Sequence, residues 1–201
     1  MPEEPCPYVS RGGLKLAAAI DAFGLDVSGF VCADFGCNVG GFTDCLLGRG
    51  AARVYAIDTG YGELAWTVRN DRRVVVLERT NALHLDPTAI DGFSGCDLVT
   101  IDLGWTRQSH AVPAALRWLR DDEAARIVTL IKPHYEAQDA EQLRGRKGIL
   151  AEADAERVLH QTLGAMPALG VRVLAHIRSP LRGGAGKGRT GNVEYLALLA
   201  R

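Results

Sequence analysis

A glycine-rich loop directly follows the first strongly apolar run of the sequence. Residues 33–44 read ADFGCNVGGFTD, in which Gly36, Gly40 and Gly41 let the backbone come close to a ligand. A helix that begins near Gly41 presents free N–H groups at the same place, and this arrangement is typical of a nucleotide-binding loop. The simpler alternative is that the glycines only form a tight turn between a strand and a helix.

The spacing of the glycines limits the kind of nucleotide. A dinucleotide fingerprint of the form G-x-G-x-x-G needs glycine where the chain has Asn38, so NAD is disfavoured. The second glycine-rich stretch, 183–191, fails as a Walker A loop, because Leu181 and Gly188 stand where glycine and Ser or Thr are required. Asp58 ends the next strand-like run, where an acid can accept hydrogen bonds from both hydroxyls of a ribose. Its alternative role is to cap the following helix.

These positions depend on an alternation of strands and helices. Runs rich in Val, Ile and Leu predict seven strands, and segments with Ala, Leu, Arg and Glu at helical spacing predict five helices. The alternation predicts a parallel sheet with helices on both faces, in one domain that spans residues 1–201. Ligands of such folds bind outside the carboxyl ends of the strands. The predicted strands are 31–35, 53–58, 74–79, 97–102, 126–132, 171–177 and 193–199, and the predicted helices lie near 12–23, 41–49, 62–70, 109–120 and 152–166.

The last two predicted strands break this alternation. They are joined by SPLRGGAGKGRTGN, which contains no helix, so they can pair antiparallel as a hairpin at the sheet edge. The predicted fold class is therefore α/β, with a seven-stranded, mostly parallel sheet whose last strand is antiparallel.

Composition excludes several classes of protein. The 201 residues are 47% hydrophobic and carry a net charge of −1, so we expect a well-buried core and no generally basic, nucleic-acid-coating surface. No stretch reaches the ~18 apolar residues of a membrane span, and the first residues match neither a signal nor a transit peptide, so we expect a cytoplasmic protein. The five cysteines form an odd set without a C-x-x-C pair, which argues against a disulfide framework and against a zinc site.

Six longer blocks extend over nearly the whole chain. They are YVSRGGLKL (8–16), GGFTD (40–44), RVYAIDTGYGELAW (53–66), RVVVLERTNA (73–82), LIKPHYEA (130–137) and GNVEYLALL (191–199). Together they resemble the haemolysin-A-type (TlyA) branch of the FtsJ-like RNA 2′-O-methyltransferases. The resemblance implies a Rossmann-like fold, S-adenosylmethionine as cofactor and RNA, in particular ribosomal RNA, as the methyl acceptor.

The same resemblance implies a catalytic tetrad of Lys15, Asp102, Lys132 and Glu194. The predicted elements agree with this, because Asp102 and Lys132 end the fourth and fifth strands at the edge of the glycine loop. Glu194 begins the last strand, which runs the opposite way, and Lys15 lies on the helix before the first strand. Taken singly, each of the four has a plainer interpretation as a solvated surface charge or an edge-strand charge.

The remaining site residues follow from the loop and from the resemblance. Asp102 would contact both the cofactor and the reacting hydroxyl. The residues expected to contact the cofactor are Asp34, Gly36, Cys37, Asn38, Gly40, Gly41, Phe42, Asp58, Thr59, Asn81, Ala82 and Asp102.

Other methyl acceptors are disfavoured by missing residues. An enzyme that methylates amino groups is expected to carry an Asn/Asp-Pro-Pro-aromatic run after the fourth strand, where this chain reads DLGW. An enzyme that methylates a pyrimidine carbon needs a thiolate at the same edge, but Cys96 lies before the fourth strand. Oxygen is therefore the expected acceptor, and its activation requires a base beside a hydroxyl that is in line with the methyl donor.

Two departures from the family pattern concern RNA recognition. The family usually carries an N-terminal S4-type RNA-binding domain, and this sequence begins almost at the methyltransferase core, so a separate RNA-targeting subunit is one expectation. The usual Ser-Phe-Ile-Ser after the fourth-strand acid is replaced by Gly-Trp-Thr-Arg at 104–107. Trp105 could stack on an extruded base or pack under the next helix.

Basic residues form two local clusters that could bind phosphates or could be solvated loops. One contains Arg178, Arg182, Lys187 and Arg189 with no acid between them, and the other contains Arg144, Arg146 and Lys147. The residues expected to contact RNA are Arg11, Trp105, Arg182, Lys187 and Arg189.

The sequence thus predicts an S-adenosylmethionine-dependent RNA 2′-O-methyltransferase. The alternative is a protein that keeps the cofactor pocket but has no turnover and serves as an RNA-binding or partner-binding module. Membrane lysis, which the word haemolysin suggests, has no support, because the sequence contains no membrane span and no basic amphipathic helix with a continuous apolar face.

Overall fold

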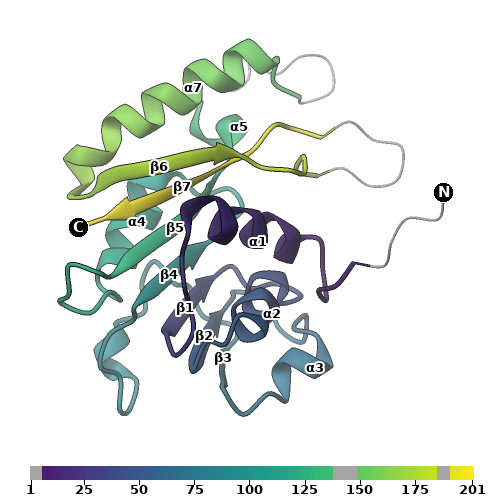
Figure 1. Cartoon of the computed structure of the whole chain (residues 1–201), viewed down its shortest axis with the longest axis vertical. Helices are drawn as coiled ribbons and strands as arrows, with labels where there is room; N and C mark the ends of the chain where they lie inside the picture. Colours follow the sequence, from purple (N-terminus) through teal and green to yellow (C-terminus); the bar gives the residue numbers. More distant parts are fainter. Residues whose placement is uncertain (1–5, 138–148, 185–190) are drawn as a thin grey trace.

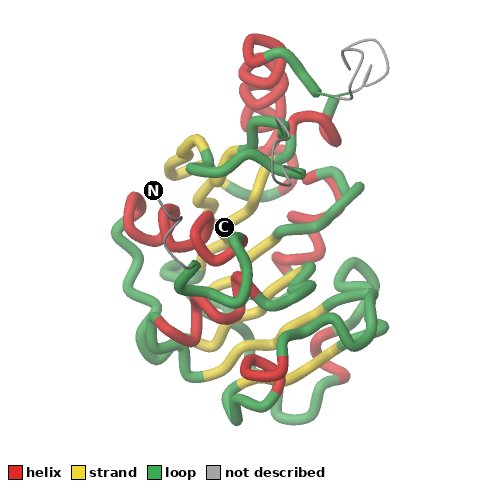
Figure 2. Tube along the Cα trace, turned by 90° about the vertical axis from the view of Figure 1, so that its right-hand side faces the viewer, coloured by secondary structure: helices red, strands yellow, loops and turns green. Residues whose placement is uncertain are grey.

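The computed structural model describes residues 6–137, 149–184 and 191–201, and these residues contain one seven-stranded sheet. The strands are β1 (Val31–Phe35), β2 (Arg53–Ile57), β3 (Val74–Leu77), β4 (Leu98–Ile101), β5 (Arg126–Ile131), β6 (Arg172–Arg178) and β7 (Tyr195–Ala200). Their order across the sheet is β3-β2-β1-β4-β5-β7-β6, which places β3 and β6 at opposite ends of the molecule (Figure 1). Figure 2 shows the strands stacked one above another through the centre of the molecule.

The predicted sheet is confirmed, with one refinement at its edge. Strands β1 to β5 pair in parallel, and β7 pairs antiparallel with both β5 and β6. The last strand therefore does not lie at the edge of the sheet but is inserted between β5 and β6. The reason is its composition: all six residues of β7, YLALLA, are buried, whereas alternate residues of β6 are exposed, as suits an edge strand.

Helices cover both faces of the sheet, as predicted. Val54 of β2 packs in a cluster with Leu16 and Leu46, whereas Tyr55, the next residue, packs in a cluster with Val112 and Val158. Because successive strand residues point to opposite faces, the helices that carry these partners lie on opposite sides. The helices are α1 (Gly12–Phe23), α2 (Gly41–Gly48), α3 (Trp66–Arg69), α4 (Gln108–Leu116), α5 (Pro133–Glu136) and α7 (Glu152–Ala165), with 3₁₀ turns at Pro87–Ala89 and Met166–Leu169.

The helix predicted near 62–70 is much shorter in the structure. It begins only at Trp66, because Gly62 adopts a φ of 76° and its N–H donates to the carboxylate of Glu78 over 3.0 Å. The segment after β2 is therefore a loop that borders the carboxyl edge of the sheet. None of the helices in the described part of the chain is long and apolar enough to cross a lipid bilayer.

The structure also contains a single helical turn, α5, that the sequence did not predict. It starts with Pro133 directly after β5, where proline is tolerated because the first N–H of a helix has no partner within it. This turn places Lys132 at its N-cap and Tyr135 above the sheet edge.

Candidate active site

The glycine loop between β1 and α2 has a backbone that only glycine adopts readily at two positions. Gly36 has a φ of 85° and Gly40 a φ of 102°, both in the left-handed region. A Cβ at position 36 would also lie 2.7 Å from the backbone oxygen of Asp102. The loop thus lies directly against the end of β4, so that the first and fourth strands share one site.

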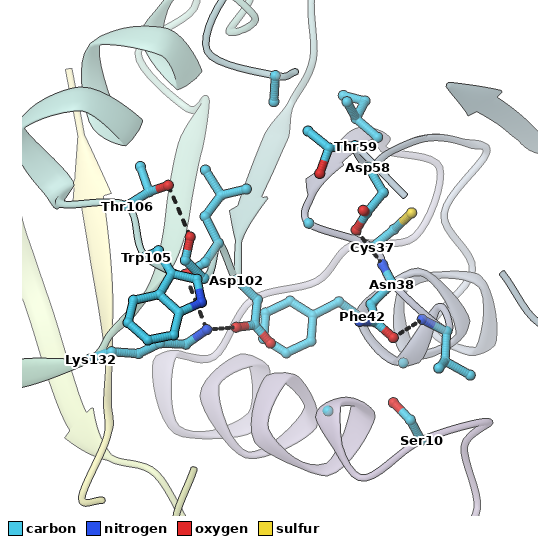
Figure 3. Close-up of a pocket in the computed structure, with 18 of the residues that line it drawn as sticks. Ser10, Cys37, Asn38, Phe42, Asp58, Thr59, Asp102, Trp105, Thr106 and Lys132 are labelled. Carbon is cyan, nitrogen blue, oxygen red and sulfur yellow. Dashed lines mark hydrogen bonds and ion pairs between the residues drawn. The ribbon is translucent and has the colours of Figure 1, made fainter. Parts of the chain in front are cut away.

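A cavity of about 740 Å³ opens above this loop, which is a size typical of small-molecule sites. Its walls come from the glycine loop, from the ends of β2, β4 and β5, and from the segments around Ser10, Asn81 and Arg182. All the residues predicted to contact the cofactor line this cavity except Asp34 and Gly40. Figure 3 shows Phe42 between the Asp102 side and the Asp58 side of the cavity.

Asp34 lies behind the loop rather than in the cavity. Its side chain is fully buried and accepts hydrogen bonds from the hydroxyl of Thr43 in α2 (2.7 Å) and from the hydroxyl of Thr100 in β4 (3.0 Å). Burial raises the pKa of Asp34 to about 7, although both hydroxyl donors oppose the shift. The geometry therefore gives Asp34 a role in holding β1, α2 and β4 together, in place of the predicted contact with the cofactor.

Asp58 supports the cavity wall through both of its carboxylate oxygens. One accepts the N–H of Asn38 over 2.8 Å and the other the N–H of Gly60 over 2.7 Å. The interpretation of Asp58 as a helix cap is wrong, because α3 begins at Trp66 and is preceded by Ala65 at its N-cap. Each carboxylate oxygen has a second lone pair, so the same side chain can also accept a ribose hydroxyl.

The four residues of the expected tetrad form two ion pairs at the carboxyl edge of the sheet. The Nζ of Lys15 lies 2.5 Å from Oε2 of Glu194, and the Nζ of Lys132 lies 2.5 Å from Oδ1 of Asp102. Lys132 also donates to the backbone oxygen of Leu103 over 3.1 Å, and Figure 3 shows both of its interactions. Burial raises the pKa of Glu194 above its usual value, while the positive charges of Lys15 and Lys132 oppose the shift.

A second cavity, of about 460 Å³, adjoins the first at these side chains. All four tetrad residues line it, and Lys15, Asp102 and Lys132 line the first cavity as well. The ion pairs thus lie at the junction of the two cavities. The second cavity also involves residues that sequence reasoning missed, namely His134, Tyr135, Gly183, Gly184 and Asn192.

Trp105 forms part of the wall of both cavities and is 80% exposed. Its backbone has a φ of 58°, and its ring packs on that of Tyr135 with centroids 4.9 Å apart at an angle of 34°. The alternative in which this side chain packs under the next helix is therefore wrong. An exposed indole at the mouth of a cavity is available to stack on a planar ligand.

The basic residues predicted to contact RNA occupy different settings. Arg11 and Arg182 line the first cavity. Arg178 and Arg182 both form ion pairs with Glu152, an acid that lies far from them in the sequence. Lys187, Arg189 and the cluster of Arg144, Arg146 and Lys147 lie outside the described residues.

Comparison with known proteins identifies this arrangement. Residues 8–199 match the family described as FtsJ-like methyltransferase. The chain belongs to the FtsJ-like methyltransferase family. As a member of this family it is an S-adenosylmethionine-dependent methyltransferase with a Rossmann-like fold, so the predictions of fold and cofactor are confirmed.

Individual relatives of this FtsJ-like methyltransferase support the assignment. The 16S/23S rRNA (cytidine-2′-O)-methyltransferase TlyA of Mycobacterium tuberculosis is 44% identical over 96% of this chain and 68% of its own length. A solved structure from Streptococcus thermophilus that carries the name hemolysin superimposes with a TM-score of 0.89 and 34% identity, over 99% of this chain and 69% of its own. Fibrillarin from Aeropyrum pernix, solved with S-adenosyl-L-methionine, shares the fold alone, with a TM-score of 0.61, 16% identity, and 94% and 76% of the two chains covered.

Proposed function

We propose that this methyltransferase transfers a methyl group from S-adenosylmethionine to a ribose 2′-hydroxyl of RNA, and that its substrate is ribosomal RNA. The observation that carries the proposal is the junction of the two cavities at the Lys15–Glu194 and Lys132–Asp102 ion pairs. The printed name of the M. tuberculosis relative, an rRNA (cytidine-2′-O)-methyltransferase, supports the same acceptor. The single sheet to which all seven strands belong supports one domain over residues 1–201.

The first cavity suits S-adenosylmethionine by the chemistry of its walls. The glycine loop allows close approach of the ligand, Asp58 can accept ribose hydroxyls, and Asn81 offers amide groups beside the apolar Ala82. When bound, the cofactor supplies a methyl group on a positively charged sulfur. The chain itself must therefore position the acceptor hydroxyl and take up one proton.

Lys132 is the residue that we assign as the proton acceptor. Lys132 would accept the hydroxyl proton at its Nζ, which must be uncharged at that moment, while the bound cofactor would supply the methyl group to the ribose oxygen. Asp102 and the backbone oxygen of Leu103 fix the position of this amine. Lys15 and Glu194, which also line the second cavity, would orient the ribose.

The charges of the four side chains at the junction balance one another in the two ion pairs. The positive sulfur of a bound donor would add one positive charge, and two cations at ~4 Å repel by roughly 4 kcal/mol at an effective dielectric constant near 20. Binding of the donor would therefore disfavour any further positive charge at the junction, and the two carboxylates would oppose this effect.

RNA recognition would use the exposed wall of the second cavity and its basic rim. Trp105 would stack on the base of the target nucleotide, while Arg11, Arg182, Lys187 and Arg189 would contact phosphates. The net charge of −1 provides little general attraction to RNA, so we propose that a ribosomal subunit or a separate RNA-targeting subunit contributes to recruitment. An RNA of the ribosome implies a cytoplasmic location.

The test is incubation of the protein with labelled S-adenosylmethionine and total RNA from a host that lacks the endogenous modification, followed by nucleoside analysis. We expect label in a 2′-O-methylated nucleoside of ribosomal RNA, and none with Lys132→Ala. Label in a base would contradict the proposed acceptor. Cofactor binding without any transfer to naked RNA or to ribosomal subunits would favour the alternative of an inactive RNA-binding or partner-binding module.

A further inference from the structure

An acidic side chain lies between the two arginines at the rim of the site. Glu152 begins α7, and its Oε1 accepts a hydrogen bond from Nη2 of Arg178 over 2.8 Å. The Nη2 of Arg182 donates to the same oxygen, and the Nη1 of Arg182 donates to the backbone oxygen of Gly191 over 3.3 Å. These ion pairs connect the first turn of α7 with the end of β6, where Arg178 is the last residue.

This trio lies next to both cavities. Arg182 lines the first cavity, which is called the donor cavity below because it would hold S-adenosylmethionine. The two residues that follow it, Gly183 and Gly184, line the second cavity, which is called the acceptor cavity below. An RNA strand that places a ribose beside Lys132 can pass this rim, where one of its phosphates would reach the two guanidinium groups.

A carboxylate and a phosphate present similar pairs of oxygens to a guanidinium group. We propose that Glu152 occupies, in the free protein, the place that an RNA phosphate takes between Arg178 and Arg182 in the complex, so that Glu152 weakens RNA binding by competition. This inference rests on the proposed RNA substrate. The sequence alone suggested that the basic cluster was an open phosphate site, whereas the inference gives Glu152 a role in that site.

The exposure of the three side chains makes such an exchange feasible. Glu152 is 50% exposed, Arg178 47% and Arg182 36%. Ion pairs of this exposure are weak, because water and salt already screen them, so replacement by a phosphate meets little resistance. The two guanidinium groups and the carboxylate of Glu152 leave a net charge of +1, part of which the nearby Glu156 offsets.

Glu152 carries its negative charge at neutral pH. Hydrogen bonds from Arg178 and then Arg182 hold the pKa of its carboxyl below the usual value. Glu152→Gln removes the negative charge and retains the shape of the side chain. A change in RNA affinity therefore reports the loss of the competing charge and not a change in side-chain packing.

The experiment compares the affinity of Glu152→Gln and of the unaltered protein for a fluorescently labelled RNA hairpin over a series of salt concentrations. We expect roughly three- to tenfold tighter binding at low salt, with the gain shrinking as salt rises. The matched control is Glu123→Gln, an exposed acid between α4 and β5 that forms no ion pair within the described residues and lies outside this cluster. This control has the same change in net charge and should strengthen binding much less.

A variant that lacks both arginines distinguishes competition at the arginine site from the general effect of removing one negative charge. In a protein with Arg178→Ala and Arg182→Ala, Glu152→Gln should give no gain beyond that of Glu123→Gln. An equal gain for the two glutamine variants in the unaltered background, or weaker binding by Glu152→Gln, would overturn the inference. RNA binding that responds to Arg182→Ala but not to Glu152→Gln would leave the proposed RNA substrate intact, whereas no RNA binding by any variant would overturn both.

Discussion

The Cα of Gly183 lies directly against the carboxylate of Glu194, so that a Cβ at position 183 would be 1.8 Å from Oε1. Real Cβ atoms do not approach an oxygen so closely, and the carboxylate is buried and paired with Lys15. A side chain at position 183 therefore requires the Glu194 carboxylate or the backbone at Gly183 to shift, which would disturb the geometry of the Lys15–Glu194 ion pair.

Gly183→Ala should lower the rate of methyl transfer by about 10²-fold, the size of effect that a shift of ~1 Å has on an aligned reaction. Cofactor affinity should change little, because neither Gly183 nor Glu194 lines the donor cavity. Single-turnover kinetics and calorimetry with S-adenosylmethionine measure the two quantities. Gly164→Ala, in the open on α7, is the control and should leave the rate unchanged. Full activity of Gly183→Ala would show that the position of Glu194 is not critical.

Lys132→Ala should reduce methyl transfer by at least about 10²-fold, because the acceptor hydroxyl loses its base. Lys132→Arg should be similarly inactive, because a guanidinium group keeps its proton at any working pH. Cofactor affinity, measured by calorimetry, should remain within a fewfold in both variants. An arginine variant with substantial turnover would show instead that position 132 supplies a fixed positive charge and that the proton leaves by another route.

The stability of the protein should fall as pH rises from about 4 to 7 through the contribution of Asp34. The pKa of this buried carboxyl is about 7 in the folded protein against 3.8 as its ordinary value, so the folded state binds more protons within this range. The full difference corresponds to a contribution on the order of 4 kcal/mol. Urea unfolding at several pH values measures it. Asp34→Asn, which cannot ionise, should show a flatter dependence, and an unchanged slope would contradict the assignment.

Trp105→Ala should weaken RNA binding by about 1–3 kcal/mol if the indole stacks on one base, and Trp105→Phe should restore much of the loss. Trp66→Ala is a suitable control, because that side chain is 76% exposed but lines neither cavity. Fluorescence anisotropy with a labelled RNA measures the three affinities. Equal losses for Trp105→Ala and Trp66→Ala would contradict base stacking in the acceptor cavity.

The meeting of the tetrad residues could be predicted because it depends on strand direction. Asp102 and Lys132 follow two parallel strands, and Glu194 precedes an antiparallel one, so topology alone brings them to one edge. The glycine loop between β1 and α2 could also be predicted. Glycine at positions 36 and 40 favours the left-handed backbone angles that the structure has there.

Contacts between segments far apart in the sequence could not be predicted in this way. Arg178 and Arg182 form a basic cluster in the sequence, but the structure adds Glu152 from the start of α7. Asp34 has the sequence position of a ligand-binding acid, yet two threonine hydroxyls from other elements hold it below the loop. Such partners depend on how the helices pack on the sheet, which hydrophobic periodicity does not specify.

The insertion of β7 between β5 and β6 has a consequence for the order in which the protein can form on the translating ribosome. The glycine loop connects β1 with α2. The strands next to β1, which are β2 and β4, precede β6 and β7 in the chain and therefore leave the exit tunnel earlier. Strand β6 emerges before β7 but is joined to the sheet only through it, and Glu194 directly precedes β7. A nascent chain can therefore form the glycine loop before the acceptor side of the site, which is complete only once β7 has been inserted between β5 and β6.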